Sequence, residues 1–421
     1  MPTIKQALQD FNPWWERPIS VGFSERTIYQ KIKQYIPLPP IIAFTGLRRV
    51  GKTTLLLKIA ADRIAQTKKP MEVVYFSFDE FKNIELREIL NAFEEITDQN
   101  LSTGNYLVLF DEIQKAKNWE EQLKTLYDVF GKNTKFIISG SESLFIHQKT
   151  KQVLAGRIFE FIIKPLSFSE YITFRGENIK PIGLHEKKIQ RLFEEYIQTQ
   201  GFPELVPIKE KEIIQKYLKE SIADKIIYQD IPGLFPIKNP TIIETLLHLL
   251  MDEPGQLIDL AGLSSQLAIS RQTLSTYLNY LEKSFLLQKL YNFSPNARKS
   301  QRKLKKYYPT ILSSRLTFEP DSTIQSIVFE WIMVRELNAE FFWRDPYQNE
   351  VDIVLRPKNP IEIKYGKIET KGIIAFMEKF KTNEGTILTH RIEERKKIKE
   401  KTIHLLPGYK KLLQNEPQSN P

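Results

Sequence analysis

The stretch Gly46-Leu47-Arg48-Arg49-Val50-Gly51-Lys52-Thr53 decides the fold of this chain. Its glycines, lysine and threonine follow the spacing G-x-x-x-x-G-K-[ST], the pattern of a loop that joins a strand to a helix around bound phosphate. An apolar run at 41–44 precedes the loop and a helix-like run at 54–61 follows it, as this setting requires. Glycines let such a loop curl until its N–H groups face phosphate oxygens. The stretch therefore predicts a site for a nucleoside triphosphate.

The residues of the loop have predicted roles. We expect the Lys52 ammonium to contact the β- and γ-phosphates, and the Thr53 hydroxyl to ligate Mg²⁺. Nothing in the spacing requires Arg48 or Arg49 to touch phosphate. The predicted ATP-binding residues are Gly46, Leu47, Arg48, Arg49, Val50, Gly51, Lys52, Thr53 and Thr54.

Strand-like and helix-like patterns alternate from residue 41 to about residue 165. This alternation predicts an α/β fold with a parallel sheet covered by helices on both faces. After the loop, strands are expected at 73–78, 106–110 and 136–139, and helices at 85–96 and 119–130.

Two carboxylates follow the apolar strand at 106–110, namely Asp111 and Glu112. Carboxylates at the carboxyl end of a parallel strand form the second half of a triphosphatase site. We expect Asp111 to hold Mg²⁺ through water, and Glu112 to orient and deprotonate the attacking water. The strand at 73–78 lies between the two halves along the chain, so they need not be neighbours in the sheet.

Three further polar residues are candidates for the same site. Ser139 and Ser141 end the strand at 136–139 and could sense the γ-phosphate or the water; an ordinary Ser-Gly-Ser turn is the alternative. Arg157 could stabilise transition-state charge, in cis or from a neighbouring subunit, or form a surface salt bridge instead.

Residues 166–237 have a helical pattern that we interpret as a lid packed on the nucleotide domain. Residues 238–296 resemble a winged helix-turn-helix, with Ser270 as the N-cap of a recognition helix at 271–283. The outward positions of that helix carry groups that suit phosphates and base edges: Arg271, Gln272, Ser275 and Asn279.

A basic linker is expected at 297–318. Such a run can bind a phosphate backbone, and a solvated loop is the alternative. Its cations are Arg298, Lys299, Arg302, Lys303, Lys305 and Lys306, and Tyr307 and Tyr308 follow them.

The last segment, 319–415, contains a second candidate site. Strands are expected at 350–355 and 361–364, so that Asp352, Glu362 and Lys364 share one spot, with Glu330 added from the helix before them. The carboxylates could hold Mg²⁺ while Lys364 positions a nucleophilic water or neutralises phosphoryl charge. An active nuclease, an inactive relic and an ordinary charged sheet face remain three alternatives.

Composition narrows the class of protein. A chain of 421 residues exceeds one typical core, so two to four domains are expected. The net charge of +10 suits a polyanionic partner or a lysine-rich solvated surface equally well. No run approaches the ~18 apolar residues of a membrane helix, and with no cysteine the chain cannot form disulfides. We expect a cytoplasmic protein without a membrane partner.

Taken together, these motifs resemble the prokaryotic AAA-family ATPases of the AAA_14 type that carry a C-terminal DUF4143 domain. The motifs that carry the resemblance are 46–54, 109–114, 139–141, 155–157, 165–168, 201–204, 350–352 and 361–364. The resemblance implies ATP binding and hydrolysis, a winged helix and a C-terminal fold similar to PD-(D/E)XK nucleases. At Gln200 the sequence departs from the resemblance, which implies a second glycine there. Near Tyr308 it implies an aspartate, where Pro309 and Thr310 stand.

The predicted organisation has six parts: a lead-in at 1–36, an ATPase domain at 37–165, the lid at 166–237, the winged helix at 238–296, the linker at 297–318 and the nuclease-like domain at 319–415. Its predicted function is a Mg²⁺-dependent ATPase coupled to the binding or processing of duplex DNA. The alternative is an ATP-operated switch that recruits protein partners and whose nuclease-like domain is inactive. A homo-oligomer is compatible with both.

Overall fold

The computed structural model describes residues 2–81, 83–140, 152–235, 237, 239–296, 298, 300, 304–318 and 321–414. The candidate sensor Ser141 lies outside these residues, as do Lys299, Arg302 and Lys303 of the basic run. The chain forms two compact units, Met1–Pro165 and Leu166–Pro421.

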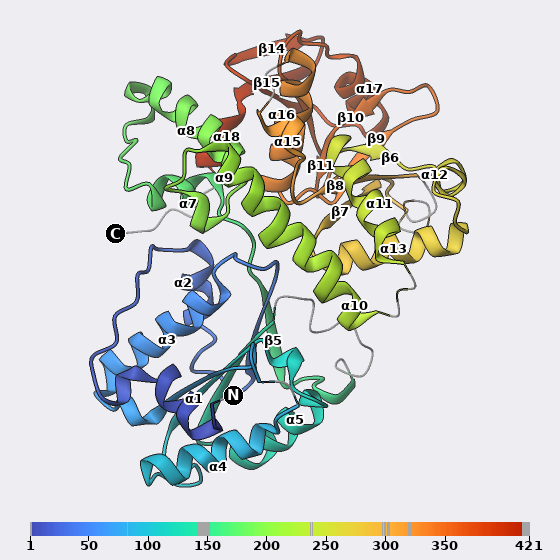
Figure 1. The fold of residues 1–421 in the computed structure, drawn as a ribbon. Helices are drawn as coiled ribbons and strands as arrows, with labels where there is room; N and C mark the ends of the chain where they lie inside the picture. Colours follow the sequence, from blue (N-terminus) through green and yellow to red (C-terminus); the bar gives the residue numbers. More distant parts are fainter. Residues whose placement is uncertain are drawn as a thin grey trace. The chain divides into compact units, whose positions relative to one another are not determined.

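The first unit is built on a five-stranded sheet in the order β2-β3-β4-β1-β5 (Figure 1). All of its neighbouring strands pair in parallel, which confirms the predicted α/β fold of this region. In the sheet, β4 lies between β1, which leads into the phosphate loop, and β3, which ends at Asp111. The strand at 73–78, β2, lies at the edge of the sheet beside β3 and not between the two halves of the site. The strands are β1 (Ile41–Thr45), β2 (Val73–Ser77), β3 (Tyr106–Asp111), β4 (Thr134–Ser139) and β5 (Ile158–Ile162).

Helices cover both faces of this sheet because nearly every strand residue is apolar and buried. Alternate strand residues pack with α1, α4 and α5 in one hydrophobic core. α3 contacts β2, β3 and β4, and its buried side chains Leu55, Leu56 and Ile59 meet the opposite face. The helices are α1 (Ile4–Phe11), α2 (Thr27–Lys33), α3 (Lys52–Thr67), α4 (Leu86–Thr97) and α5 (Trp119–Phe130).

The N-terminal segment packs along the edge strand β2. The Asn12 side chain donates to the carbonyl of Tyr75 at 2.8 Å and accepts from its N–H at 2.7 Å. The Trp14 and Trp15 indoles both donate to the carbonyl of Val73 at 3.1 Å. Backbone N–H and C=O groups on the outer side of β2, which no neighbouring strand pairs, thereby form hydrogen bonds. The two tryptophans thereby attach the N-terminal segment to the sheet of the first unit.

The second unit contains two mixed sheets, in the orders β10-β9-β7-β8-β6 and β11-β12-β13-β15-β14 (Figure 1). The first of these joins strands from 256–309 to strands from 341–351, across the expected linker. The strands are β6 (Gln256–Leu257), β7 (Leu287–Asn292), β8 (Lys305–Pro309), β9 (Phe341–Arg344), β10 (Glu350–Val351), β11 (Ile353–Leu355), β12 (Asn359–Lys364), β13 (Glu384–Thr389), β14 (Glu394–Ile398) and β15 (Lys401–Pro407).

The helices expected to form a lid belong to the core of the second unit. Leu166, Phe168, Leu192 and Tyr196 pack in one cluster with Trp331 and other residues of that unit. These helices thus belong to the second unit, and their action as a lid stays a prediction. The helices of this region are α7 (Phe168–Phe174), α8 (Glu186–Thr199), α9 (Lys211–Lys216) and α10 (Ile231–Leu234), with π-helical turns at Tyr217–Ala223 and Ile226–Asp230.

Gln200 explains how the turn after α8 tolerates a residue other than glycine. It caps the helix in the left-handed conformation, with φ 51°. Its buried side chain donates to Thr317 at 3.1 Å and accepts from the N–H of Leu312 at 2.9 Å. These two bonds offset the strain of a left-handed non-glycine residue.

The helix predicted at 271–283 forms with the expected bounds. Ser270 accepts from the N–H of Thr273 at 3.0 Å as its N-cap. Leu274, Leu278 and Leu281 are buried, whereas the four side chains predicted to face outward are exposed. The other helices are α11 (Pro240–Asp252), α12 (Leu260–Gln266), α13 (Arg271–Lys283), α15 (Ser314–Phe318), α16 (Ser322–Glu336), α17 (Lys371–Phe380) and α18 (Gly408–Gln414).

None of the helices in the described part of the chain is both long and apolar enough to cross a bilayer.

Candidate functional site

The loop between β1 and α3 is fixed at its first glycine by close packing. Gly46 has φ 136°, and a Cβ added there would lie 2.1 Å from the carbonyl oxygen of Ile163. The Ile163 N–H also donates to the carbonyl of Thr45 at 2.7 Å. Only glycine fits at this approach of two backbones.

The second half of the loop leads directly into a helix. Gly51 is the N-cap of α3 and adopts φ 95°, a left-handed conformation that favours glycine. The N–H groups of the first helical turn have no partner within the helix and carry partial positive charge. This end of α3 can therefore receive an anion.

Lys52 is buried and holds the loop closed. Its ammonium donates to the carbonyl oxygens of Gly46 at 3.1 Å and Leu47 at 2.7 Å. Thr53, the next residue, is exposed. The side chains of Lys52 and Thr53 thus lie at the loop itself, where the sequence predicts them.

Asp111 is the point at which the two halves of the site meet. The Thr53 hydroxyl donates to its Oδ2 at 2.6 Å, although 58 residues separate them. Tyr75 donates to the same oxygen at 2.9 Å, and Ser139 donates to Oδ1. Burial, and then the nearby charge of Glu112, raise the pKa of the Asp111 carboxyl. Three hydroxyl donors orient this carboxylate without an ammonium among them.

Glu112 leaves the sheet in the left-handed conformation, with φ 54°. Its N–H donates to Ser139 Oγ at 3.3 Å, so Ser139 bridges both carboxylate residues. The Gln114 side chain donates to Glu112 Oε2 at 2.7 Å. The arrangement positions Glu112 beside Asp111, and its role as a base stays a prediction.

Sequence reasoning missed Tyr75 and Gln114. Tyr75 reaches Asp111 because it pairs with Leu109, which points to the same face of the sheet as Asp111 two residues later. Side chains alternate between the two faces of a strand, so the sequence at 73–78 indicates which of its residues share a face with Tyr75. The register that aligns Tyr75 with Leu109 is visible only in the structure.

The oxygen ligands at this site suit Mg²⁺. Magnesium in nucleotide sites takes one or two protein oxygens, the remaining positions being filled by water and phosphate. The Thr53 hydroxyl and the Asp111 carboxylate supply such a pair. Among the described residues no group of three or more His, Cys, Asp or Glu could hold a metal ion alone, which a nucleotide-bound metal does not require.

Arg157 is not brought to this site. It precedes β5, and its backbone carbonyl accepts from Ile41 at the start of β1, whereas the loop follows the end of β1. Five strand residues separate the two edges, or about 16 Å at the usual rise. Its side chain pairs with Asp128 at 3.1 Å. A role in cis is therefore excluded by position, and a role in trans stays a prediction.

The second candidate site does assemble, but around an ammonium. Lys306 Nζ lies 2.6 Å from Glu350, 3.3 Å from Glu330 and 3.9 Å from Asp352. Tyr308 donates to Glu330 at 2.6 Å, and Lys364 pairs with Glu362 at 2.7 Å. The sequence places Glu330, Asp352, Glu362 and Lys364 correctly together. It assigns Lys306 instead to the basic run, as a residue that binds a phosphate backbone or belongs to a solvated loop.

Strand geometry accounts for this assembly. The strand expected at 350–355 is broken at Asp352 into β10 and β11, which lie in different sheets. Asp352 is buried at the break and accepts from the N–H of Ile363 at 2.8 Å. Lys306 lies on β8, whose pairing with β7 directs it inward. Of the described part of the basic run, Lys306, Tyr307 and Tyr308 are thus buried rather than exposed to a phosphate backbone.

The pKa shifts follow from this packing. Burial, then Glu330 and Glu362, raise the pKa of Asp352 far above its ordinary range. Burial opposes ionisation of Glu330, but Lys306 and the Tyr308 hydroxyl outweigh it and lower the pKa. Burial likewise opposes charging of Lys306, but Glu330 and the other acids hold its pKa well above the ordinary value. Lys306 is therefore an ammonium that neutralises the cluster.

This cluster does not fit a catalytic metal. A dication among Glu330, Glu350 and Asp352 would meet the Lys306 ammonium within the same 4 Å, and like charges at that distance repel strongly. We therefore derive no metal-dependent step from Glu330, Asp352, Glu362 and Lys364.

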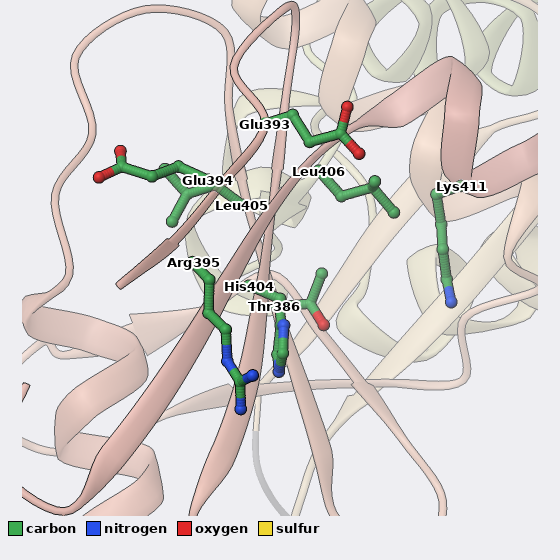
Figure 2. A pocket seen from close by; sticks show the side chains of 8 residues that line it. All are labelled: Thr386, Glu393, Glu394, Arg395, His404, Leu405, Leu406 and Lys411. Carbon is green, nitrogen blue, oxygen red and sulfur yellow. The ribbon is translucent and has the colours of Figure 1, made fainter. Parts of the chain in front are cut away.

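A pocket of about 460 Å³ lies against β14, β15 and α18 (Figure 2). Both signs of charge line it, with Glu393 and Glu394 opposing Arg395 and Lys411. Lys410 next to it is already paired with Glu186 and Glu393. The lining selects no particular ligand, and no residue predicted to be functional reaches it.

Comparisons with known families agree with this geometry. Residues 38–172 match the family AAA_14, an AAA domain, and residues 190–310 match DUF8612, a domain of unknown function. The chain thus combines an AAA-type P-loop ATPase domain with a DUF8612 region. An AAA domain implies nucleotide binding, typically with Mg²⁺. The family matched in the second half is DUF8612, whereas the sequence resemblance named DUF4143.

Individual relatives extend over much of the chain. An uncharacterized protein of Methanocaldococcus jannaschii is 28% identical over 409 residues, which cover 87% of this chain and 84% of that protein. An uncharacterized protein of Haemophilus influenzae is 26% identical over 273 residues, covering 63% and 66%.

Among solved structures, domain III of the replication initiation protein DnaA from Thermotoga maritima has a TM-score of 0.28 at 13% identity, covering 48% of this chain and 94% of that one. PCH-2 of C. elegans has a TM-score of 0.31 at 11% identity, covering 54% and 67%. TM-scores this low carry no functional argument.

Proposed function

We propose that the first unit binds ATP with Mg²⁺ and hydrolyses it. The observation that carries this proposal is the 2.6 Å hydrogen bond between Thr53 of the loop and Asp111 of β3. The two side chains that the sequence assigns to Mg²⁺, one from the phosphate loop and one from the end of β3, thereby meet at one point. An isolated glycine-rich turn would not produce this convergence.

The proposed roles follow from position. The loop from Gly46 to Thr54 surrounds the phosphates with N–H groups, and Lys52 turns from its own loop carbonyls to the β- and γ-phosphates. Thr53 and Asp111 would hold Mg²⁺, which would supply charge neutralisation at the phosphates. Glu112 accepts the proton of the attacking water. Ser139 fixes the relative position of Asp111 and Glu112.

Two variants of the purified chain test the proposal. Lys52→Ala should abolish ATP binding in an equilibrium titration with Mg²⁺-ATP. Glu112→Gln should bind ATP with wild-type affinity but lower kcat by about 10²- to 10⁴-fold, the usual contribution of a general base. Lys132→Ala, at an exposed position, is the matched control. Wild-type ATP turnover by Lys52→Ala would disprove the assignment.

We further propose that the second unit couples ATP turnover to duplex DNA through α13. The supporting observation is the exposed row of Arg271, Gln272, Ser275 and Asn279 on one well-capped helix. The arrangement of α11, α12, α13 and β7 fits a winged helix-turn-helix. Fluorescence anisotropy with duplex DNA should give an affinity that falls with salt. The double variant Arg271→Ala, Gln272→Ala should weaken it, whereas Lys397→Ala should not.

One observation favours a second function, an ATP-operated switch that recruits a protein partner. The Lys306 ammonium neutralises the nuclease-like cluster, so we propose that this domain does not cut DNA. ATP turnover that is unchanged by duplex DNA, with no DNA binding in the anisotropy titration, would support the switch. Mg²⁺-dependent nicking that disappears in Asp352→Ala would contradict it.

A further inference from the structure

Arg26 lies in the N-terminal segment, to which the sequence assigns no chemistry, yet its side chain reaches the phosphate loop. It is only 5% exposed. Its Nη1 donates to the carbonyl of Val50 at 3.0 Å and its Nη2 donates to the carbonyl of Lys164 at 2.9 Å. One guanidinium therefore bridges the loop and the segment that follows β5.

The surrounding contacts hold this guanidinium in place. Arg26 is the N-cap residue of α2, and α2 is attached to α3 because Tyr29 donates to Asp62 at 2.5 Å. Lys58 pairs with the same carboxylate at 2.6 Å. A Cβ added at Gly51 would lie 3.8 Å from Arg26 Nη1, so the guanidinium lies directly beside the loop.

The bond to Val50 has a consequence for the next residue. The carbonyl of Val50 and the N–H of Gly51 belong to one planar trans peptide and point in opposite directions. When Arg26 holds the carbonyl on its own side, the Gly51 N–H must point away from Arg26. The second hydrogen bond, to the carbonyl of Lys164, prevents the guanidinium from rotating. A planar guanidinium that donates to two fixed carbonyl oxygens can take only one orientation.

We propose that Arg26 is a positioning residue of the nucleotide site, which turns the Gly51 N–H toward the phosphates of bound ATP or ADP. This inference rests on the proposed function. Arg26 does not touch the nucleotide itself and acts through the Val50–Gly51 peptide. An N–H that is already oriented avoids the cost of ordering the loop when the ligand binds.

Such a residue affects ground-state binding rather than chemistry. The Gly51 N–H contacts phosphate both before and during the reaction, and uniform binding of this kind changes affinity with little change in kcat. Loss of this orientation should weaken nucleotide binding about tenfold to hundredfold, which corresponds to about 1.4–2.8 kcal/mol.

The test compares the full-length wild type with Arg26→Ala and Arg26→Lys. Dissociation constants for Mg²⁺-ATP and ADP are measured by titration calorimetry, and kcat is measured at saturating ATP. Both variants should bind both nucleotides about tenfold or more weakly, with kcat within about threefold of wild type. Arg26→Lys should not restore affinity, because one ammonium cannot span both carbonyls. Arg17→Ala, an exposed arginine of the same segment, is the control.

The outcomes separate this inference from the proposed function. If wild type fails to bind ATP, or Lys52→Ala binds it normally, the nucleotide site itself is wrong. If Lys52→Ala loses binding while both Arg26 variants bind as wild type, only the role of Arg26 is overturned. Full affinity in Arg26→Lys alone would also overturn it, since charge and not orientation would then suffice. Arg26→Lys, which keeps the charge, provides the comparison if Arg26→Ala does not fold.

Discussion

Asp111 in the first unit and Asp352 in the second are both buried carboxylates at the end of a strand, but their partners differ. Asp111 is held by the hydroxyls of Thr53, Ser139 and Tyr75. Asp352 belongs to a group of four carboxylates with two ammoniums, Lys306 and Lys364. Hydroxyls orient a carboxylate and leave its charge to be neutralised by an incoming cation. An internal ammonium neutralises the charge permanently, so the same residue type serves a site in one unit and the core in the other.

The largest expected effect comes from removing the internal cation. Lys306→Met removes the buried ammonium that Glu330, Glu350 and the buried Asp352 share, which should lower the free energy of unfolding by about 3–5 kcal/mol. Urea unfolding measures it, with Lys397→Met at an exposed position as control. The loss should shrink at lower pH, where protons replace the ammonium. A loss below about 1 kcal/mol would mean that Lys306 does not hold the cluster together.

Removing one of the hydroxyl donors to Asp111 should change the Mg²⁺ dependence of ATP turnover and not the stability of the fold. Tyr75→Phe removes a hydrogen bond to Asp111 but keeps the ring, so Asp111 is less well oriented for Mg²⁺. The Mg²⁺ concentration for half-maximal ATP turnover should rise about tenfold, as expected for one bond to a charged group. Tyr127→Phe, on α5, is the matched control. An unchanged Mg²⁺ requirement would show that Thr53 and Ser139 suffice.

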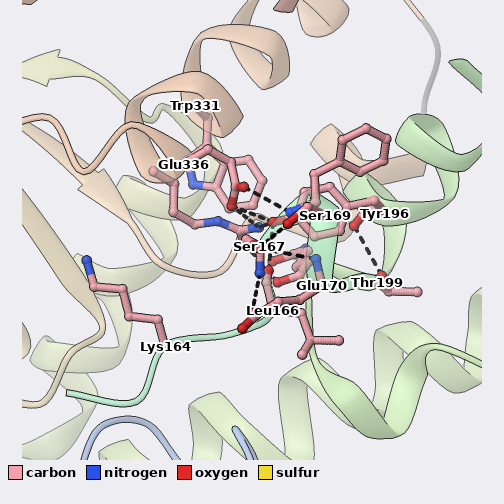
Figure 3. Close-up of polar contacts among 12 residues, drawn as sticks. Lys164, Leu166, Ser167, Ser169, Glu170, Tyr196, Thr199, Trp331 and Glu336 are labelled. Carbon is pink, nitrogen blue, oxygen red and sulfur yellow. Dashed lines mark hydrogen bonds and ion pairs between the residues drawn. The ribbon is translucent and has the colours of Figure 1, made fainter. Parts of the chain in front are cut away.

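Glu336 is a third acidic side chain with little exposure, and its contacts include a tyrosine hydroxyl and a backbone N–H (Figure 3). The Tyr196 hydroxyl donates to Glu336 Oε1 at 2.5 Å and also lies 2.8 Å from the carbonyl oxygen of Leu166. Glu336 Oε2 accepts from the N–H of Phe168 at 3.0 Å. Burial, partly opposed by Arg335, raises the pKa of Glu336.

This arrangement predicts a pH-dependent effect of Glu336→Gln. A raised carboxyl pKa means that wild-type stability falls as pH rises from the ordinary value of 4.5 through the folded-state pKa. Glutamine keeps the hydrogen bonds and has no such proton to lose. Thermal unfolding should show the variant gaining stability relative to wild type as pH increases across that window. A difference that stays constant with pH would contradict a raised pKa of Glu336; exposed Glu88→Gln is the control.

The smallest effect is expected from Arg157, whose charged group is partly exposed to solvent. Its pair with Asp128 is partly exposed to solvent, so Arg157→Ala should cost at most about 1 kcal/mol of stability. ATP turnover by dilute protein should stay within about twofold, because Arg157 lies at the far edge of the sheet. A loss of turnover that appears only at high protein concentration would instead identify Arg157 as acting in trans.

The sequence by itself determined the first unit. A phosphate-binding loop, alternating strand and helix patterns and a strand ending in Asp111 and Glu112 are local signals, and local spacing is sufficient to specify them. The cap at Ser270 and the helix that it begins were likewise readable from the chain. These features depend on neighbours a few residues away.

Only the tertiary structure decided which side chains from distant elements meet. Tyr75 reaches Asp111 through strand register, and Arg26 orients the loop across 24 residues of sequence. Lys306, which reads as part of a solvated basic run, is buried because β8 pairs within a sheet that the sequence does not delimit. Its charge is the same in both readings, but burial among carboxylates changes what that charge does. Pairing between strands far apart in sequence depends on the whole core, and no local pattern encodes it.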